Sequence, residues 1–266
     1  MTHIPGAHII ITGGSEGIGA EFARLARTQG ARVSLIARRE GPLQAVAREI
    51  GAEHVAADVT DEEAISEAVR RLECLQGPCD ILVTAAGIAL PGRFTDTPLR
   101  DAETEWRVNV LGTMAAVRAV VPGMIARNRG HIVTVSSTAG LIGVVGYTGY
   151  TPTKWAVRGF SQALRYEVEP HGVRVSVLYP PDTKTPGFAR ENTRKPPETA
   201  AVSGAITPVP AERVAVALAR GIERDRASIT ADALTRILIG FGPAFETLAR
   251  PTLNRHIRRA VANSTS

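Results

Sequence analysis

The chain has 266 residues, of which 44% are hydrophobic and 21% are charged, a composition typical of a soluble globular protein. Two cysteines, Cys74 and Cys79, exclude a disulfide framework, and six scattered histidines lead us to expect no metal site. The start lacks a basic leader with a cleavage site, which predicts a cytoplasmic protein. The net charge of +5 lies in residues 190–266. No nucleic-acid-binding motif accompanies it, so an anionic membrane surface is the favoured macromolecular contact.

Short β-branched runs alternate with longer helical patterns over the first 180 residues. The predicted strands lie at 8–12, 32–37, 54–58, 81–86, 131–137 and 174–179. The predicted helices lie near 17–29, 40–50, 61–76, 101–128 and 152–169. Apolar strands separated by helices indicate a parallel sheet that is covered on both faces. We therefore predict one α/β domain over residues 1–266, built on a doubly wound, Rossmann-type parallel sheet.

A glycine-rich turn, "TGGSEGIG", follows the first predicted strand and opens the first helix. Gly13, Gly17 and Gly19 would let the backbone turn tightly and approach a pyrophosphate at the helix N-terminus. Their spacing is G-x-x-x-G-x-G, and an ordinary tight turn is the alternative. The position directly after the first strand favours dinucleotide binding.

The end of the second strand, "SLIARRE", predicts which dinucleotide is bound. An NAD site usually has an acidic residue about 20 residues after the glycines, which binds the ribose 2′-hydroxyl. Here Ala37 is followed by Arg38 and Arg39, and a guanidinium binds a phosphate through forked hydrogen bonds. The sequence therefore favours NADP(H), with two ordinary exposed arginines as the alternative.

Tyr150 and Lys154 stand four residues apart in "YTPTK", which places both on one face of a helix. A nearby ammonium would lower the pKa of the phenol from about 10 and allow proton exchange near neutral pH. Pro152 is tolerated in a first helical turn, although it disfavours the helical conformation at Thr151. We predict that this helix begins at residue 151 or 152 and keeps Lys154 beside Tyr150. Taken alone, the pair is common on surface helices.

Together, "TGGSEGIG", "TAAG" (84–87), Asn109, Ser136–Ser137 and "YTPTK" resemble the short-chain dehydrogenase/reductase family over nearly the whole chain. The resemblance implies a ketone held by Ser137 and Tyr150, hydride transfer from the nicotinamide, and protonation of the developing alkoxide by Tyr150. Ser137 would stabilise that alkoxide, and Lys154 would hold the nicotinamide ribose. Asn109 would anchor a water that links Lys154 to solvent, with a satisfied polar group inside helix 101–128 as the alternative.

The same resemblance implies the contacts of the cofactor. Asp58 would contact the adenine edge, while Thr183 and Thr185 would hold the carboxamide and the phosphates. The implied catalytic residues are Asn109, Ser137, Tyr150 and Lys154. The implied residues for NADP(H) are Gly13, Ser15, Gly17, Ile18, Gly19, Arg38, Arg39, Asp58, Val59, Ala86, Gly87, Tyr150, Lys154, Pro180, Thr183 and Thr185.

Two further implications concern assembly and one departure from the family pattern. Family habit predicts a homodimer or homotetramer formed through helices 101–128 and 152–169. Thr84 stands where the family usually has asparagine, which predicts a weaker strand-bracing contact.

Residues 182–210 are rich in proline, threonine and charge and follow a strand end, where open α/β sheets bind ligands. They predict a mobile segment that covers the substrate. The run "LYPPDTKTPGFARENTRKPPET" (178–199) is similar to the 3-ketodihydrosphingosine reductase branch, as are "PGRF" (91–94) and "STAGLIGVVGYTGY" (137–150). This similarity implies NADPH-dependent reduction of the 3-keto group of a long-chain sphingoid base. The alternatives are another ketone or alcohol, such as a steroid or a 3-oxoacyl thioester, and a non-catalytic NADP(H) sensor.

Residues 228–266 are a predicted basic, amphipathic C-terminal extension. Within 234–262, leucine, isoleucine and phenylalanine mix with arginines, and glycine and proline interrupt the apolar run. This run is too short to span a bilayer, which needs about 20 apolar residues. It predicts either a peripheral membrane contact through anionic headgroups or a helix packed on the core or on a partner subunit.

Overall fold

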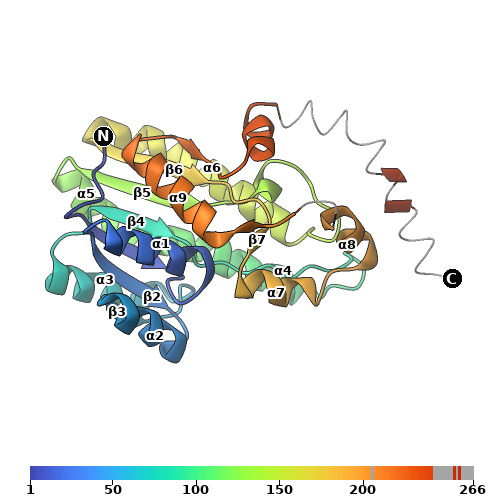
Figure 1. Ribbon diagram of the computed structural model, residues 1–266, viewed down its shortest axis with the longest axis horizontal. Coiled ribbons are helices and arrows are strands. Elements are labelled where there is room, and N and C mark those ends of the chain that lie inside the picture. Colours follow the sequence, from blue (N-terminus) through green and yellow to red (C-terminus); the bar gives the residue numbers. More distant parts are fainter. Residues whose placement is uncertain (205–206, 242–253, 256, 259–266) are drawn as a thin grey trace.

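A seven-stranded parallel sheet forms the centre of the computed structural model, which describes residues 1–204, 207–241, 254–255 and 257–258 (Figure 1). The strand order is β3-β2-β1-β4-β5-β6-β9. This arrangement confirms the predicted doubly wound α/β fold. The strands are β1 (His8–Thr12), β2 (Arg32–Ala37), β3 (Glu53–Ala56), β4 (Ile81–Thr84), β5 (Gly130–Val135), β6 (Val173–Leu178) and β9 (Ser228–Ile229).

Helices cover both faces of this sheet, which explains why the inner strands β1, β4 and β5 are buried along their whole length. In β1, Ile9 and Ile11 belong to one core cluster and Ile10 belongs to the other, because successive side chains point to opposite faces. The first cluster includes residues of α1 (Gly17–Thr28), α2 (Glu40–Ile50) and α9 (Ala211–Glu223). The second includes residues of α3 (Glu62–Gln76), α5 (Gly112–Ala126) and α6 (Tyr150–Val168).

The helix predicted at 101–128 is divided in the structure. It consists of α4 (Leu99–Trp106), a π-helical turn at Arg107–Leu111, and α5. The whole stretch Leu99–Ala126 is long and apolar enough to cross a membrane by composition, but α5 packs against α3, β4 and β5. Part of its apolar character therefore serves the core, where Ala116, Val117 and Val120 are buried. The π-helical turn carries Asn109, which is fully buried.

Residues 182–210 contain regular elements that the sequence did not predict. They form β7 (Thr183–Lys184), α7 (Pro186–Asn192), α8 (Pro197–Ser203) and β8 (Val209–Pro210), and β7 pairs with β8 in parallel. Figure 1 shows α7 and α8 beyond the carboxyl ends of the sheet strands. The segment is therefore placed where it can cover a ligand.

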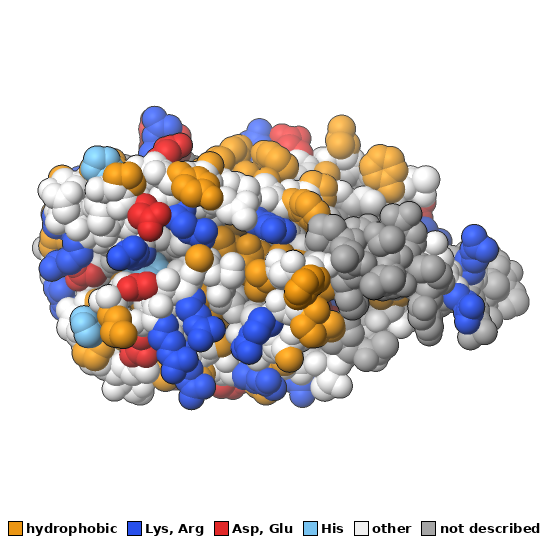
Figure 2. Space-filling view, turned by 90° about the horizontal axis from the view of Figure 1, so that it is seen from above, with side chains coloured by type: hydrophobic (Ala, Val, Ile, Leu, Met, Phe, Trp, Pro, Cys, Tyr) orange, Lys and Arg blue, Asp and Glu red, His pale blue; other side chains and the backbone are white. Residues whose placement is uncertain are grey.

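The predicted C-terminal extension begins inside the sheet, because Ser228–Ile229 form the edge strand β9 beside β6. Residues 233–241 are helical. Residues 242–253, 256 and 259–266, which include Arg250 and Arg259 of the extension, lie outside the described residues. On the face in Figure 2, basic side chains are interspersed with acidic and apolar ones.

Two buried histidines brace the amino-terminal edge of the sheet. His8 Nε2 lies 2.8 Å from Ser34 Oγ, which joins β1 to β2, and His131 Nε2 lies 2.7 Å from Ser176 Oγ, which joins β5 to β6. Burial lowers the pKa of His131 to about 4. A neutral ring at physiological pH suits this structural position, which lies at the edge of the sheet opposite the glycine-rich turn.

Candidate functional site

A cavity of about 1410 Å³ lies at the carboxyl end of the parallel sheet, the position at which open α/β sheets bind ligands. Its walls come from the glycine-rich turn, the ends of β2, β4 and β5, the start of α6, and the segment from β6 to α8. All the predicted site residues line it except Gly19 and Asn109. Strands β4 and β5 end at 84 and 135, earlier than predicted, because the residues after them leave the sheet to form these walls.

The glycine-rich turn is shaped for close backbone approach. Gly13 has φ +73°, and a Cβ there would lie 2.5 Å from the backbone nitrogen of Ala86. A Cβ at Gly19 would collide with the carbonyl oxygen of Gly13. Helix α1 begins at Gly17, and its N-cap residue Glu16 makes no side-chain cap, so the helix N-terminus remains available to an anionic group. The turn therefore fits the phosphates of a dinucleotide.

Arg38 and Arg39 have different surroundings. Arg38 is 73% exposed, and its guanidinium lies 3.5 Å from the carboxylate of Asp58. Burial raises the pKa of Asp58, but hydrogen bonds from Thr60 and the charge of Arg38 outweigh burial, and the net pKa is lowered. Arg39 is bound by Glu16, which also holds Arg190 of α7. Arg38 is thus the arginine better placed to receive a phosphate.

Tyr150 and Lys154 lie together at the start of α6. The helix begins at Tyr150, one residue before the predicted range, and Pro152 lies in its first turn. The Nζ atom of Lys154 is 5.5 Å from the centroid of the Tyr150 ring and donates a hydrogen bond of 3.1 Å to the carbonyl oxygen of Val135. Lys154 is 4% exposed, and this burial lowers its pKa to about 8.

The prediction that Lys154 lowers the pKa of Tyr150 is wrong for the structure described. Burial is the largest influence and raises the pKa of the phenol, while a hydrogen bond with Ser137 acts in the opposite direction. The Lys154 ammonium is directed at the Val135 carbonyl and is itself destabilised by burial. Three carboxylates raise the pKa of Tyr150 further: Glu191, Glu105 and Asp182. A phenol in these surroundings keeps its proton at neutral pH, so the neutral hydroxyl of Tyr150 faces the cavity.

Ser137 occupies the end of β5 and faces the cavity. Its Oγ accepts a hydrogen bond of 3.2 Å from the backbone N–H of Ala139, which orients the hydroxyl at the start of a 3-10 turn. The loop after β5 is close to α6, because Ser136 Oγ donates a hydrogen bond of 2.8 Å to the carbonyl of Lys154. The serine and the tyrosine are therefore held in one rigid corner of the cavity.

Asn109 lies below the cavity wall, and its side chain is satisfied within the protein. Its Nδ2 donates to the carbonyl of Ile88 at 2.9 Å and to Thr153 Oγ1 at 3.0 Å, and its Oδ1 accepts from the Ile88 N–H at 2.9 Å. The amide thus ties the loop after β4 to α6, and its role toward a water stays a prediction. The buried Thr84 hydroxyl has no hydrogen-bond partner among the described residues, in keeping with the weaker brace predicted there.

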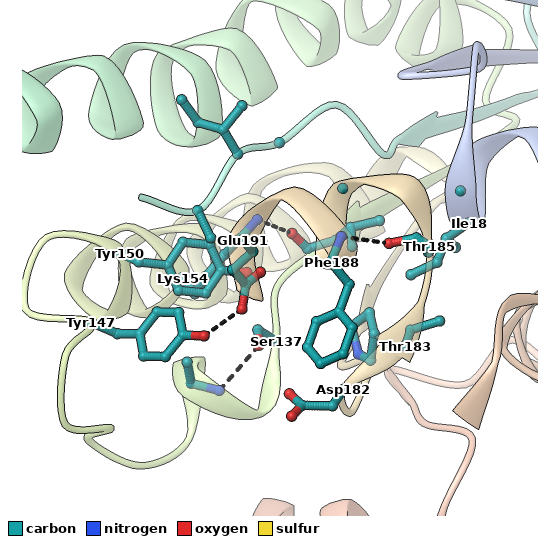
Figure 3. A pocket seen from close by; sticks show the side chains of 18 of the residues that line it. Ile18, Ser137, Tyr147, Tyr150, Lys154, Asp182, Thr183, Thr185, Phe188 and Glu191 are labelled. Carbon is teal, nitrogen blue, oxygen red and sulfur yellow. Dashed lines mark hydrogen bonds between the residues drawn. The ribbon is translucent and has the colours of Figure 1, made fainter. Parts of the chain in front are cut away.

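A polar group next to the catalytic pair was not predicted from the sequence. The Tyr147 hydroxyl donates a hydrogen bond to Glu191, and Lys195 Nζ lies 3.5 Å from that carboxylate (Figure 3). Lys195 also lies over the Phe188 ring, 4.3 Å from its centroid. Spacing alone could not indicate this group, because Tyr147 precedes α6 while the others belong to α7 or follow it.

Glu105 is a second residue that the sequence reasoning missed. It is 1% exposed, and its Oε1 accepts a hydrogen bond of 2.7 Å from the Leu90 N–H. Burial is the main cause that raises its pKa to about 7. A Cβ at Gly149 would come within 2.5 Å of Glu105 Oε2. Glycine at this position therefore makes room for the carboxyl beside the N-terminus of α6.

The far wall of the cavity is apolar. It is formed by the loop after β5, by α7 and α8, and by the helical residues 233–241. Its apolar side chains are Ile142, Val144, Val145, Phe188, Ala201, Val202, Leu234 and Leu238. The cavity thus joins a polar dinucleotide region to an apolar chamber, with Ser137 and Tyr150 between them.

Comparisons with known proteins agree with this geometry. The family model described as short chain dehydrogenase matches residues 7–196. A 3-ketodihydrosphingosine reductase of Bos taurus is 39% identical over 222 residues, which cover 80% of this chain and 67% of the relative. A 3-ketodihydrosphingosine reductase of Dictyostelium discoideum is 35% identical over 263 residues, which cover 90% of this chain and 79% of the relative. A serine dehydrogenase solved in its closed form with NADP+ superposes with a TM-score of 0.73 at 31% identity, covering 79% of this chain and 87% of the other.

The pKa of Lys154 can be measured directly. Because burial disfavours the ammonium, we expect this group to titrate at about pH 8, below the ordinary value of 10.5. The positive charge is complete below that pH and is lost as the pH rises through it. NMR of protein with 15N-labelled lysine side chains would follow the titration, and Lys154→Arg, which removes the signal, would assign it. Titration near 10.5 would contradict the prediction.

Proposed function

The chain belongs to the short-chain dehydrogenase family, and from that premise we propose that it is an NADPH-dependent reductase of 3-ketodihydrosphingosine, forming dihydrosphingosine. The chain is an oxidoreductase that interconverts C=O and CH–OH with a nicotinamide cofactor. The observation that supports the proposal is one cavity lined by the glycine-rich turn, by Ser137 and Tyr150, and by apolar side chains such as Phe188 and Leu238. The relatives named above support the sphingoid ketone as the substrate.

In this proposal the protein side chains orient the ketone and supply its proton. Ser137 and Tyr150 donate hydrogen bonds to the ketone oxygen, and Tyr150 transfers its proton as negative charge develops there. The raised pKa of Tyr150 keeps that proton in place until the charge appears. Lys154 binds the nicotinamide ribose. The reduced nicotinamide, when bound, supplies the hydride for the carbonyl carbon.

The proposed contacts of the dinucleotide follow the walls of the cavity. Its phosphates lie on the glycine-rich turn and the N-terminus of α1, where Gly13 and Gly17 have positive φ angles. Arg38 binds the 2′-phosphate, and Asp58 and Val59 border the adenine. The loop after β4, with Ala86 and Gly87, lines the path to the nicotinamide.

The apolar chamber supports a substrate with a long hydrocarbon chain, because burial of each CH₂ group contributes about 0.8 kcal/mol. Other apolar ketones, such as a steroid or a 3-oxoacyl thioester, remain the alternative substrates for the same catalytic pair. They lack the combination of a long single chain and an amino group that a sphingoid ketone presents.

We also propose that the protein forms a homodimer or homotetramer. The chain exposes large apolar side chains on the neighbouring elements from α4 to α6, including Trp106, Leu111, Met114 and Trp155. Such residues are typical of a protein–protein interface. Light scattering of the purified protein measures the mass in solution, and a monomeric mass contradicts this proposal.

A peripheral membrane contact of a cytoplasmic protein is the remaining proposal on location. Leu234, Ile237 and Phe241 are exposed on the helical residues 233–241, which border the cavity. An apolar helix face of this kind inserts shallowly at a lipid interface. Flotation with anionic vesicles tests this contact, and protein that stays at the bottom of the gradient contradicts it.

The reductase activity is tested by following NADPH consumption with 3-ketodihydrosphingosine, a steroid ketone and a 3-oxoacyl thioester. We expect the sphingoid ketone to have the highest kcat/KM. Tyr150→Phe removes the proton donor, so turnover should fall by about 100-fold or more, while NADPH binding, measured by fluorescence, persists. Brisk turnover of the steroid or the thioester without turnover of the sphingoid ketone would show that the substrate is misassigned.

The cofactor preference is tested at Arg38. Replacement by Gln removes a charge-assisted hydrogen bond to the 2′-phosphate, so the KM for NADPH should rise about 10- to 100-fold relative to that for NADH. Arg39→Gln is the matched control, because Arg39 is already bound by Glu16 and its replacement should change this ratio less. An equal effect of both variants would contradict the assignment of Arg38.

A further inference from the structure

The cavity contains a carboxylate that the proposed reaction does not use. We propose that Asp182 determines the substrate specificity by binding the ammonium group next to the ketone, so that the site selects long-chain α-amino ketones. This inference rests on the proposed function and deepens it, because it assigns the residue that distinguishes a sphingoid ketone from other apolar ketones.

The first observation is that Asp182 differs from the other acidic residues of the cavity wall. Each of the others has a side-chain partner within the described residues. Glu16 binds Arg39 and Arg190, Asp58 binds Thr60 and Arg38, Glu191 binds Tyr147 and Lys195, and Asp232 accepts a hydrogen bond of 3.2 Å from the Thr230 hydroxyl. The Asp182 carboxylate has no hydrogen bond or ion pair to any side chain or backbone group that the structure describes.

The second observation is that the position of Asp182 is fixed. The residue follows Pro180 and Pro181 directly after β6, and its backbone carbonyl accepts a hydrogen bond of 2.9 Å from the Val209 N–H. The next residue, Thr183, begins β7 and bonds back to the Pro181 carbonyl at 2.6 Å. The side chain is half-buried and lines the cavity. The backbone of Asp182 is therefore held in place before a ligand arrives, which leaves less chain to order on binding.

The third observation is the proximity of Asp182 to the reacting groups. Its charge is one of those that raise the pKa of Tyr150, and Figure 3 shows it at the cavity wall with Ser137 and Phe188. In a sphingoid ketone the carbon that carries the ammonium is bonded to the carbonyl carbon. A ketone oxygen held by Ser137 and Tyr150 thus brings the ammonium into the same part of the cavity, where a carboxylate can accept its N–H groups.

The neighbouring ion pair explains why Asp182, and not Glu191, fills this role. Lys195 is 3% exposed, and together with the Tyr147 hydroxyl it occupies the Glu191 carboxylate. Both partners contact Oε1 of Glu191, and a second cation at this carboxylate would be repelled by the Lys195 ammonium that already pairs with it. Asp182 makes no ion pair within the described residues; burial raises its pKa, and the more distant charge of Lys195 acts against that rise. A ketone without an amino group would instead place apolar atoms against this carboxylate and remove its water without compensation, which disfavours such substrates.

The test compares two ketones that differ in one group: 3-ketodihydrosphingosine, and the same long-chain ketone with hydrogen in place of the 2-amino group. The measured quantity is the ratio of their kcat/KM values. We expect wild type to prefer the amino ketone and Asp182→Asn, which keeps the shape and removes the charge, to lower this preference about 10- to 100-fold. Glu212→Gln is the control, because Glu212 is an exposed residue of α9 that does not line the cavity. This control should keep the wild-type ratio.

The outcomes separate this inference from the proposed function. A wild-type enzyme that reduces neither ketone contradicts the proposed function itself. Equal reduction of both ketones by wild type, or the same preference in Asp182→Asn, leaves the reductase activity in place and overturns the role of Asp182. If Asp182→Asn turns over neither ketone, calorimetric binding of dihydrosphingosine and its desamino counterpart to the NADP+-loaded variant decides by the same ratio. A loss confined to the amine supports the inference, and an equal loss for both overturns it.

Discussion

The buried ammonium of Lys154 is the interaction on which the catalytic corner depends. Its hydrogen bond to the Val135 carbonyl ties α6 to the end of β5, and Ser136 completes the connection by binding the Lys154 carbonyl. Gly140 leaves room for this contact, since a Cβ there would lie 2.8 Å from the Lys154 carbonyl oxygen. Tyr150 is the first residue of the same helix, so its position is set together with that of Lys154. The geometry of the phenol therefore follows from the need to satisfy a charge inside the protein.

Burial shifts the pKa values of Tyr150 and Lys154 in opposite directions. Carboxylates and low solvation hold the proton on Tyr150, while burial weakens the hold of Lys154 on its own proton. The site therefore presents the neutral phenol of Tyr150 to the cavity. A protonated Tyr150 agrees with a reductase, in which the tyrosine gives up its proton when negative charge appears at the ketone oxygen.

The sequence predicted the frame of the site well, because strand periodicity and the glycine-rich turn are local signals. Strands β1 and β2 have the predicted bounds, and the predicted cofactor residues line one cavity except Gly19, which packs beneath it. The division of helix 101–128 at Arg107–Leu111 was not predictable, since a π-helical turn keeps an apolar pattern like that of an α-helix. The pKa of Tyr150 was predicted in the wrong direction because residue spacing contains no information on burial.

The contacts that the sequence could not reveal join segments far apart in the chain. Arg93 pairs with Glu198, and Arg194 pairs with Asp101, so α8 and the end of α7 are attached to the loop after β4 and to α4. These attachments anchor α7 and α8, which belong to the segment that the sequence predicted as a cover for the substrate. This arrangement of the segment brings Asp182 and Glu191 to the wall of the cavity.

Glu16 connects two parts of the cavity wall that are far apart in the chain. Glu16 lies in the glycine-rich turn, and its carboxylate forms ion pairs with Arg39, which follows β2, and with Arg190 of α7. The glycine-rich turn and the helix beside the apolar chamber are thus joined through a single carboxylate. Because one carboxylate binds both arginines, a displacement of the glycine-rich turn would also shift the contact that holds α7 beside the apolar chamber.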